Sequence, residues 1–343
     1  MNLEIIVAVL VIVFALAFDF TNGFHDAANA IASAVSTRAL SPRVALTLAA
    51  VMNLIGAMLG TAVASTIAKE IVELSHIAPM DQLTIVLAAL IGAITWNLLT
   101  WWFGLPSSSS HAIIGGLVGA GLSAMLFSGD LFVKWDSVWH KVVEPMFLSP
   151  LVGFLGAYIV MIIIQWIFRR ANPTKAYKGF RVAQIFSSAA LALGHGLQDA
   201  QKSMGIIFMA CAASGLLGVD GSTDHIPLAI MLMCALAIGA GTFVGGKRIM
   251  KTLGSKIIDI DPAKGFSAEL VSATVLYVTA YFVKAPISTT HTVTSSILGA
   301  GAANKAKAVN WMVARNIVGG WFITMPMAAV IAFVLHEILR LFL

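Results

Sequence analysis

The sequence predicts an all-α membrane protein, a polytopic helical bundle of two inverted-topology repeats with broken or re-entrant helices. Hydrophobic residues make up 59% of the 343 residues and charged residues only 11%, where soluble domains carry about 25% charged residues. Several uncharged stretches reach the roughly 20 residues that a helix needs to cross a bilayer core. Two polar motifs also occur twice, in the same order. This composition excludes a cytosolic enzyme, a nucleic-acid-binding protein and a disordered chain.

The N-terminal apolar segment is expected to stay in the protein as its first helix. It carries Glu4 and lacks the basic start that a cleavable signal peptide needs. Further uncharged stretches predict membrane spans at residues 44–68, 82–103, 146–168 and 226–246. Two stretches with one charge each are weaker candidates, residues 266–283 with Glu269 and residues 309–335 with Arg315.

The loops between these stretches differ in charge. Four loops hold most of the basic residues: Arg38, Arg43, Arg169, Arg170, Lys175, Lys178, Arg181, Lys247, Arg248, Lys251, Lys256, Lys264, Lys305 and Lys307. The alternating loops hold few basic residues and several acids, such as Glu70, Glu73, Asp220 and Asp224. Because cytoplasmic loops collect Lys and Arg, we expect the basic loops inside, both termini outside, and the chain in the inner (cytoplasmic) membrane. The net charge of +5 then reflects these loops.

The two repeated motifs predict a duplicated chain. Residues 23–30 resemble residues 196–203, and residues 106–111 resemble residues 286–291. We expect a first repeat at 1–168, a basic cytoplasmic linker at 169–181, and a second repeat at 182–343. The loop after the first motif is basic in one half and acidic in the other, which indicates halves inserted in opposite directions. That is the plan of many secondary transporters.

The first motif places polar residues on one face of a helix, because their spacings alternate between three and four residues. These residues are Asp19, Asn22, Asp26, Asn29 and Ser33. In the second half, the places of Asn22, Asp26 and Asn29 are taken by His195, Asp199 and Lys202.

Carboxylates inside a membrane are costly and usually face a cavity or a partner. Asp26 and Asp199 are therefore candidates for function, although they can instead pair to hold helices together. The adjacent Gly23, Gly194 and Gly196 predict a break in each helix at this depth. A hard cation such as Na⁺ prefers oxygen ligands, which the side chains of the cation candidates can supply: Asp26, Asn29, Asp199 and Gln201. Lys202 is expected either to neutralise an anion or to pair with Asp199.

The second motif predicts an anion site. Each copy runs from Pro through hydroxyl residues to His, which is typical of a helix N-terminus, where free N–H groups and the helix dipole favour anions. The hydroxyl residues are Ser107, Ser108, Ser109, Ser110, Ser288, Thr289 and Thr290. Hydroxyls donate without adding charge, which suits a tetrahedral oxyanion that must be released. The alternative is that they only cap helices or bond back to carbonyls. His111 and His291 are expected to orient the site, to transfer protons or to contact the anion directly.

Together these four segments resemble the duplicated signatures of the inorganic phosphate transporter (Pit) family over nearly the whole chain. The resemblance implies uptake of inorganic phosphate coupled to Na⁺ or H⁺, with no other cofactor. It implies cation sites at Asp26, Asn29, Asp199 and Gln201, with Na⁺ at the first three, and phosphate at residues 107–110 and 288–290. Supporting positions around these sites are Asn22, His25, His111, Gln198, Lys202 and His291.

The motifs depart from the family pattern in two places. Many members read Gly-Ala-Asn-Asp, whereas Phe24 and His25 precede Asp26 here, and Leu197 and Gln198 stand where Ala-Asn is usual. A histidine at this position resembles a bacterial variant that is associated with proton coupling or metal-phosphate transport.

Three other functions are weighed against phosphate symport. Sulfate is an oxyanion that the same hydroxyls would suit, so a sulfate permease is one alternative, and a passive anion channel is another. An intramembrane hydrolase is disfavoured, because the sequence has no Gly-x-Ser-x-Gly elbow, no His-Glu-x-x-His and no phosphate-binding loop.

Cys211 and Cys234 lack the spacing of metal ligands. Gly116, Gly119 and Gly121 are suited to helix packing, either within the chain or across a homodimer.

Overall fold

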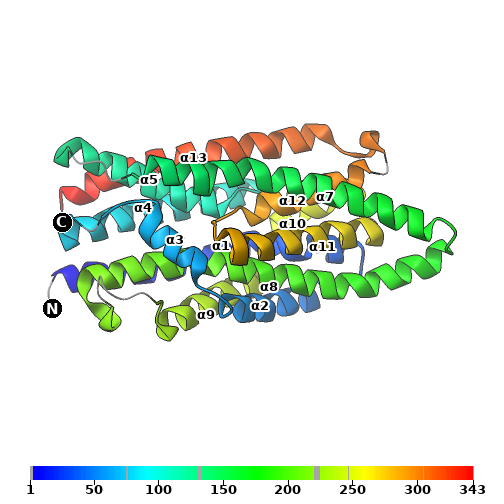
Figure 1. The fold of residues 1–343 in the computed structure, drawn as a ribbon, viewed down its shortest axis with the longest axis horizontal. Helices are drawn as coiled ribbons and strands as arrows, with labels where there is room; N and C mark the ends of the chain where they lie inside the picture. Colours follow the sequence, from blue (N-terminus) through cyan, green and yellow to red (C-terminus); the bar gives the residue numbers. More distant parts are fainter. Residues whose placement is uncertain are drawn as a thin grey trace.

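The computed structural model describes residues 3–74, 76–129, 133–219, 225–245, 247–303 and 305–342, and in these the fold is all-helical (Figure 1). Six helices are long and apolar enough to cross a membrane, or up to eight if each of two bent helix pairs counts as one span. The prediction of an all-α membrane protein is therefore confirmed. Asp220 and Asp224 of the predicted acidic loop lie outside the described residues.

The helices alternate between long spans and short segments. The bounds are α1 Leu3–Ser36, α2 Pro42–Ala57, α3 Ala62–Glu70, α4 Pro79–Phe103, α5 Ser109–Ser128, α6 Trp135–Val138, α7 Glu144–Phe168, α8 Pro173–Ser214, α9 Leu228–Val244, α10 Lys247–Ser255, α11 Pro262–Val278, α12 Thr289–Ala302 and α13 Trp311–Arg340. Short π segments, Trp139–Val143 and Thr279–Val283, adjoin α7 and α11. Proline begins α2, α4, α8 and α11, where its missing N–H costs no hydrogen bond.

The predicted helix breaks at Gly23, Gly194 and Gly196 are wrong, because α1 and α8 each run through these positions as one helix. Two of these glycines permit close packing instead. A Cβ at Gly23 would lie 2.4 Å from the carbonyl oxygen of Ile238, and one at Gly196 would lie 2.2 Å from that of Asn53. A neighbouring backbone occupies the space that a side chain would need.

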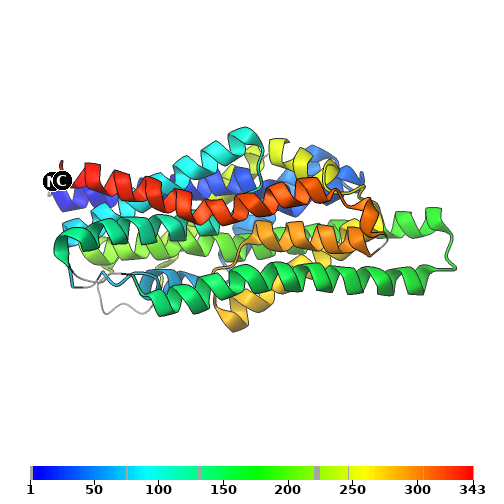
Figure 2. The same ribbon diagram turned by 90° about the horizontal axis from the view of Figure 1, so that it is seen from above.

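The interruptions lie elsewhere in each half. The pairs α2–α3 and α9–α10 bend by 66° and 69° at short breaks. The pairs α4–α5 and α11–α12 form hairpins, whose tips at residues 104–108 and 284–288 are mostly not helical. The two hairpins enter the bundle from opposite ends and meet near its middle (Figures 1 and 2). Their tips touch where the Ser110 hydroxyl donates to the carbonyl of Ile287, at 2.9 Å.

The two halves are interlocked, since the most extensive helix packing joins one half to the other. Helix α1 packs on α9, α8 on α2, α5 on α13 and α12 on α7. The contacts are matched: a Cβ at Gly119 would lie 2.0 Å from the carbonyl oxygen of Ala329, and one at Gly299 would lie 2.0 Å from that of Phe154. This pattern agrees with a duplicated chain. Insertion of the halves in opposite directions stays a prediction, and so does a homodimer. Gly119, one of the glycines suited to packing across a homodimer, instead packs against Ala329 within the chain.

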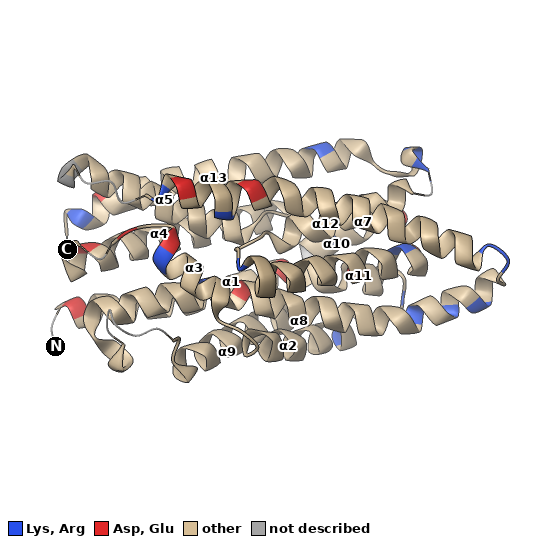
Figure 3. Ribbon diagram, viewed as in Figure 1, with Lys and Arg blue, Asp and Glu red and all other residues tan. Residues whose placement is uncertain are grey.

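Charge separates the two ends of the bundle (Figure 3). Basic residues gather at the end that holds the α7–α8 connection, whereas both termini lie at the other end. The loops predicted to be cytoplasmic thus gather at one end of the bundle, opposite both termini.

Candidate phosphate and cation site

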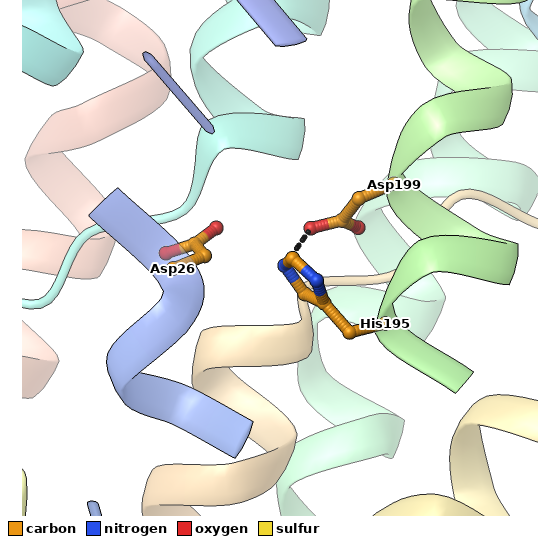
Figure 4. A group of neighbouring side chains, drawn as sticks. All are labelled: Asp26, His195 and Asp199. Carbon is orange, nitrogen blue, oxygen red and sulfur yellow. Dashed lines mark ion pairs between the residues drawn. The ribbon is translucent and has the colours of Figure 1, made fainter. Parts of the chain in front are cut away.

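Two buried carboxylates face each other at mid-bundle, where the hairpin tips meet α1 and α8. Asp26 of α1 is 1% exposed, and Asp199 of α8 is fully buried. Both point into the same space as His195 (Figure 4), and one ligand atom from each of the three lies within 4.8 Å of the others. The structure therefore brings together the two carboxylates that the repeat predicted to be equivalent.

Asp26 accepts hydrogen bonds from both hairpins. The Ser109 hydroxyl of α5 donates to its Oδ2 at 3.0 Å, and the Thr290 hydroxyl of α12 donates to its Oδ1 at 3.1 Å. Nδ1 of His25 lies 2.9 Å from Oδ1. The other ring nitrogen of His25 is 3.4 Å from the Ser107 hydroxyl. Both copies of the second motif thus converge on one carboxylate.

Asp199 lies between two basic side chains. Lys202 pairs with its Oδ1, and Nε2 of His195 lies 2.9 Å from its Oδ2. Thr289 and Asn22 donate to Oδ2 at 3.3 and 3.5 Å. The fully buried ammonium of Lys202 neutralises Asp199 locally. Asp199 is therefore paired with a buried ammonium, whereas the basic group beside Asp26 is the imidazole of His25.

The remaining hydroxyls of the motif differ in their contacts. Ser108 and Ser288 are the N-caps of α5 and α12, and each accepts the N–H of the histidine three residues later at 3.2 Å. Their hydroxyls are thus engaged as caps, the alternative that the sequence left open. The first N–H groups of a helix have no partner within the helix. Two such ends, with their positive dipoles, meet here.

Two of the predicted cation ligands differ in what their oxygens contact. Asn29 donates to the Thr290 hydroxyl at 2.9 Å, while its Oδ1 has no hydrogen-bond partner among the described residues. Gln201 instead caps α3, because its Oε1 accepts the backbone N–H groups of Val63 and Ala64 at 2.7 and 3.3 Å. The oxygen of Asn29 is therefore available to a cation, whereas that of Gln201 is already shared by two donors.

Three other predicted residues, Gln198, His111 and His291, contact neighbouring elements of the bundle. Gln198 reaches α11 and the π segment that follows it, donating to the Thr279 hydroxyl at 2.9 Å. His111 and His291 stack edge to face with ring centroids 4.7 Å apart, and His291 also stacks on Trp321. The contact between these two rings joins the first turns of α5 and α12.

Two further side chains shape the site: His195, which the sequence placed on the polar helix face without a role, and Asn53, which it missed. His195 contacts Asp199, and Asn53 of α2 lies 2.9 Å from the other ring nitrogen of His195. The spacing of four residues between His195 and Asp199 was a usable signal, since such residues share a helix face. Asn53 belongs to an apolar stretch without a motif, so nothing in the sequence marks it.

Chemically, the site offers carboxylate and amide oxygens beside neutral hydroxyls and the first backbone N–H groups of α5 and α12. Carboxylate and amide oxygens suit a hard cation or, at the carboxylates, a proton. Hydroxyls and backbone N–H groups suit a tetrahedral oxyanion. The arrangement can hold a cation and an anion side by side.

Comparisons with known proteins agree with this chemistry. A family model described as the phosphate transporter family matches residues 22–332. A protein of Bacillus subtilis (strain 168) named "Probable low-affinity inorganic phosphate transporter" is 44% identical over 300 residues, covering 88% of this chain and 87% of that protein. A protein of the same name from Rhizobium meliloti (strain 1021) is 45% identical, covering 85% and 84%. The solved structure named "The sodium-dependent phosphate transporter" is 26% identical with a TM-score of 0.84, covering 98% of this chain and 100% of that chain.

Proposed function

We propose that this chain, which belongs to the phosphate transporter family, is a symporter that imports inorganic phosphate across the cytoplasmic membrane together with Na⁺ or H⁺. The observation that carries the proposal is the meeting of two hydroxyl-bearing helix N-termini with Asp26 and Asp199. The name of the structural neighbour, a sodium-dependent transporter, supports Na⁺ as one coupling ion.

We assign the anion to the hairpin tips and the cation to the facing helices. Ser109, Ser110, Thr289 and Thr290, with the N–H groups of α5 and α12, hold phosphate in this assignment. Asp26, Asn29 and Asp199 hold the cation in this assignment: the two carboxylates share one space, and Asn29 bonds to Thr290, which donates to Asp26. Gln201 positions α3 instead of binding the ion. No side chain is assigned a catalytic role.

Charge supports symport over a passive anion channel. The site brings together two buried carboxylates, and the Lys202 ammonium pairs with only one of them, Asp199. A buried negative charge repels a lone anion and attracts a cation, so phosphate binds favourably only when cations accompany it. A passive anion path would have no use for this charge.

Uptake by the purified protein in proteoliposomes tests the function. Phosphate should accumulate inside when an inward Na⁺ or H⁺ gradient is imposed, and accumulation should stop when the gradient is collapsed. Excess sulfate should compete weakly, because sulfate lacks the proton that phosphate can donate to a carboxylate acceptor. Accumulation of sulfate in preference to phosphate would favour the sulfate permease, and gradient-independent equilibration would favour a channel.

Single cysteines test the proposed orientation. Ala78 and Gly179 are exposed at opposite ends of the bundle, and the native Cys211 and Cys234 are buried. We expect a membrane-impermeant thiol reagent added outside cells to label Ala78→Cys and to spare Gly179→Cys until the membrane is opened. Labelling of Gly179→Cys from outside would contradict the assignment of the basic end to the cytoplasm.

A further inference from the structure

A third buried carboxylate lies on α1 outside the site described above. Asp19 is fully buried and lies two helical turns before Asp26, about 10 Å along the helix axis, on the side of the end that carries both termini. Its Oδ1 accepts the Ser203 hydroxyl of α8 at 2.6 Å. Its Oδ2 has no partner in good hydrogen-bond geometry among the described residues, and the other donor beside this carboxyl is the Cys234 thiol of α9. An acid in this position needs a positive occupant or must be neutral.

The surroundings of Asp19 supply little to stabilise a negative charge. The titratable groups that face it are the Cys234 thiol of α9 and the Asp199–Lys202 pair of α8. Lys202 is already paired with Asp199, and a thiol is a weak donor. An ionised carboxylate in a low-dielectric interior is costly unless a partner compensates it.

A second buried acid, Glu269 of α11, has more hydrogen-bond donors around it than Asp19 has. Glu269 of α11 accepts hydrogen bonds from Ser33, from Ser187 at 2.5 Å and from Gln184 at 3.3 Å. These donors come from α1 and α8. Asp19 has only the Ser203 hydroxyl and the Cys234 thiol beside it among the described residues, and a thiol is a weak donor.

The identity of the occupant follows from the ligands. Na⁺ and other hard cations take several oxygen ligands, whereas Asp19 is accompanied by one hydroxyl and a thiol. A proton needs no further ligand. Asp19 lies four residues before Gly23 of the motif. The matching position in the second half, four residues before Gly196, is Ala192, so this acid occurs once rather than twice.

We propose that Asp19 binds one proton that crosses the membrane with each phosphate, at a coupling site separate from the Asp26–Asp199 pair. The inference rests on the proposed transport function. Asp19 takes the proton from water on the side of the termini and releases it to water on the basic side. The carboxyl group stays neutral while the site is closed to water on both sides of the membrane.

The test measures protons and phosphate together. The full chain is reconstituted with a pH-sensitive dye inside the vesicles, under an inward Na⁺ gradient, at the same alkaline pH on both sides so that phosphate enters mainly as the divalent ion. Radioactive phosphate then reports uptake while the dye reports acidification. We expect Asp19→Asn to lower the protons moved per phosphate at least tenfold, or to stop net uptake while exchange of internal for external phosphate continues.

Two further variants make the test decisive. Asp81→Asn, at the exposed start of α4, is the matched control and should keep the wild-type ratio. Ser203→Ala removes the hydrogen bond that favours the ionised carboxyl, so the pH for half-maximal uptake should rise by up to about one unit, even if Asp19→Asn fails to fold. A wild-type proton ratio in Asp19→Asn, or a wild-type pH profile in Ser203→Ala, would overturn the proposal. Absence of phosphate uptake by the unaltered protein under both an inward Na⁺ gradient and an inward H⁺ gradient would instead refute the transport function itself.

Discussion

Asp26→Asn and Asp199→Asn should each abolish gradient-driven accumulation of phosphate. Divalent phosphate entering against an inside-negative potential is opposed by about 2.3 kcal/mol per charge per 100 mV. At least two monovalent cations must therefore accompany it for electrically neutral transport. Asp26 and Asp199 face the same space between the halves, and they are the matched acids of the repeat, so removal of either charge should uncouple the cation from phosphate.

The two variants should differ in their side effects. Asp199→Asn leaves the buried ammonium of Lys202 without its counter-charge, and breaking a buried pair costs about 3–5 kcal/mol. The double variant Asp199→Asn/Lys202→Met removes both charges and should recover stability without recovering accumulation. Asp26→Asn creates no such unpaired cation.

Accumulation and exchange are measured separately in proteoliposomes. Net uptake should fall to the level of empty vesicles in both single variants, while exchange of internal for external phosphate can persist, since exchange needs no gradient. Asp136→Asn, at an exposed acid of α6, serves as the control. Wild-type accumulation in both Asp26→Asn and Asp199→Asn would remove these carboxylates from the coupling mechanism.

Removal of one hydroxyl from each hairpin, Ser109→Ala with Thr289→Ala, should weaken phosphate binding while the protein stays folded. These hydroxyls occupy equivalent positions, and each donates to the carboxylate of its own half. A hydrogen bond to a charged group contributes about 1.5–3 kcal/mol, which corresponds to roughly a ten- to a hundredfold loss of affinity at each position. The effects on the two hairpins should add if both contact the same anion.

Equilibrium binding of radioactive phosphate to the detergent-solubilised protein measures this loss. Thr274→Ala, an exposed threonine that bonds only to its own helix, is the matched control. Ser108→Ala gives a useful contrast, because Ser108 caps α5 and loss of a cap typically costs about 1 kcal/mol of stability. Normal phosphate affinity in the double variant would show that these hydroxyls do not hold the anion.

The sequence was informative about elements whose signals are local. Uncharged stretches predicted α4, α7 and α9 closely, and Pro followed by hydroxyls predicted the start of α5 and α12. The sequence did not predict where helices bend or stay straight, because contacts between distant helices determine this. The stretch 44–68 contains a bend of 66° between two helices that the sequence did not mark, and α1 stays whole at Gly23, where the backbone of α9 fills the space beside it.

The candidate site was predictable only to the level of its motifs. The repeat identified Asp26 and Asp199, and the structure places them in one space. Which hydroxyl bonds to which carboxylate depends on how two distant hairpins meet, and no spacing reports that. Gln201 illustrates the limit: its oxygen, two residues from Asp199 in the motif, suggested an ion ligand, but the N-terminus of α3 takes that oxygen.

The interlocking of the halves has a consequence for biosynthesis. When the ribosome has completed α7, the helices that cover α1, α2 and α5, namely α9, α8 and α13, have not yet been made. Asp26 then lacks Thr290, and the polar face of α1 has no α8 to pack against. The nascent first half must therefore wait in the membrane, with a costly acid only partly compensated, until nearly the whole chain has been inserted. A chain that stops before α13 leaves α5 uncovered, and such a fragment is a natural target for membrane proteases.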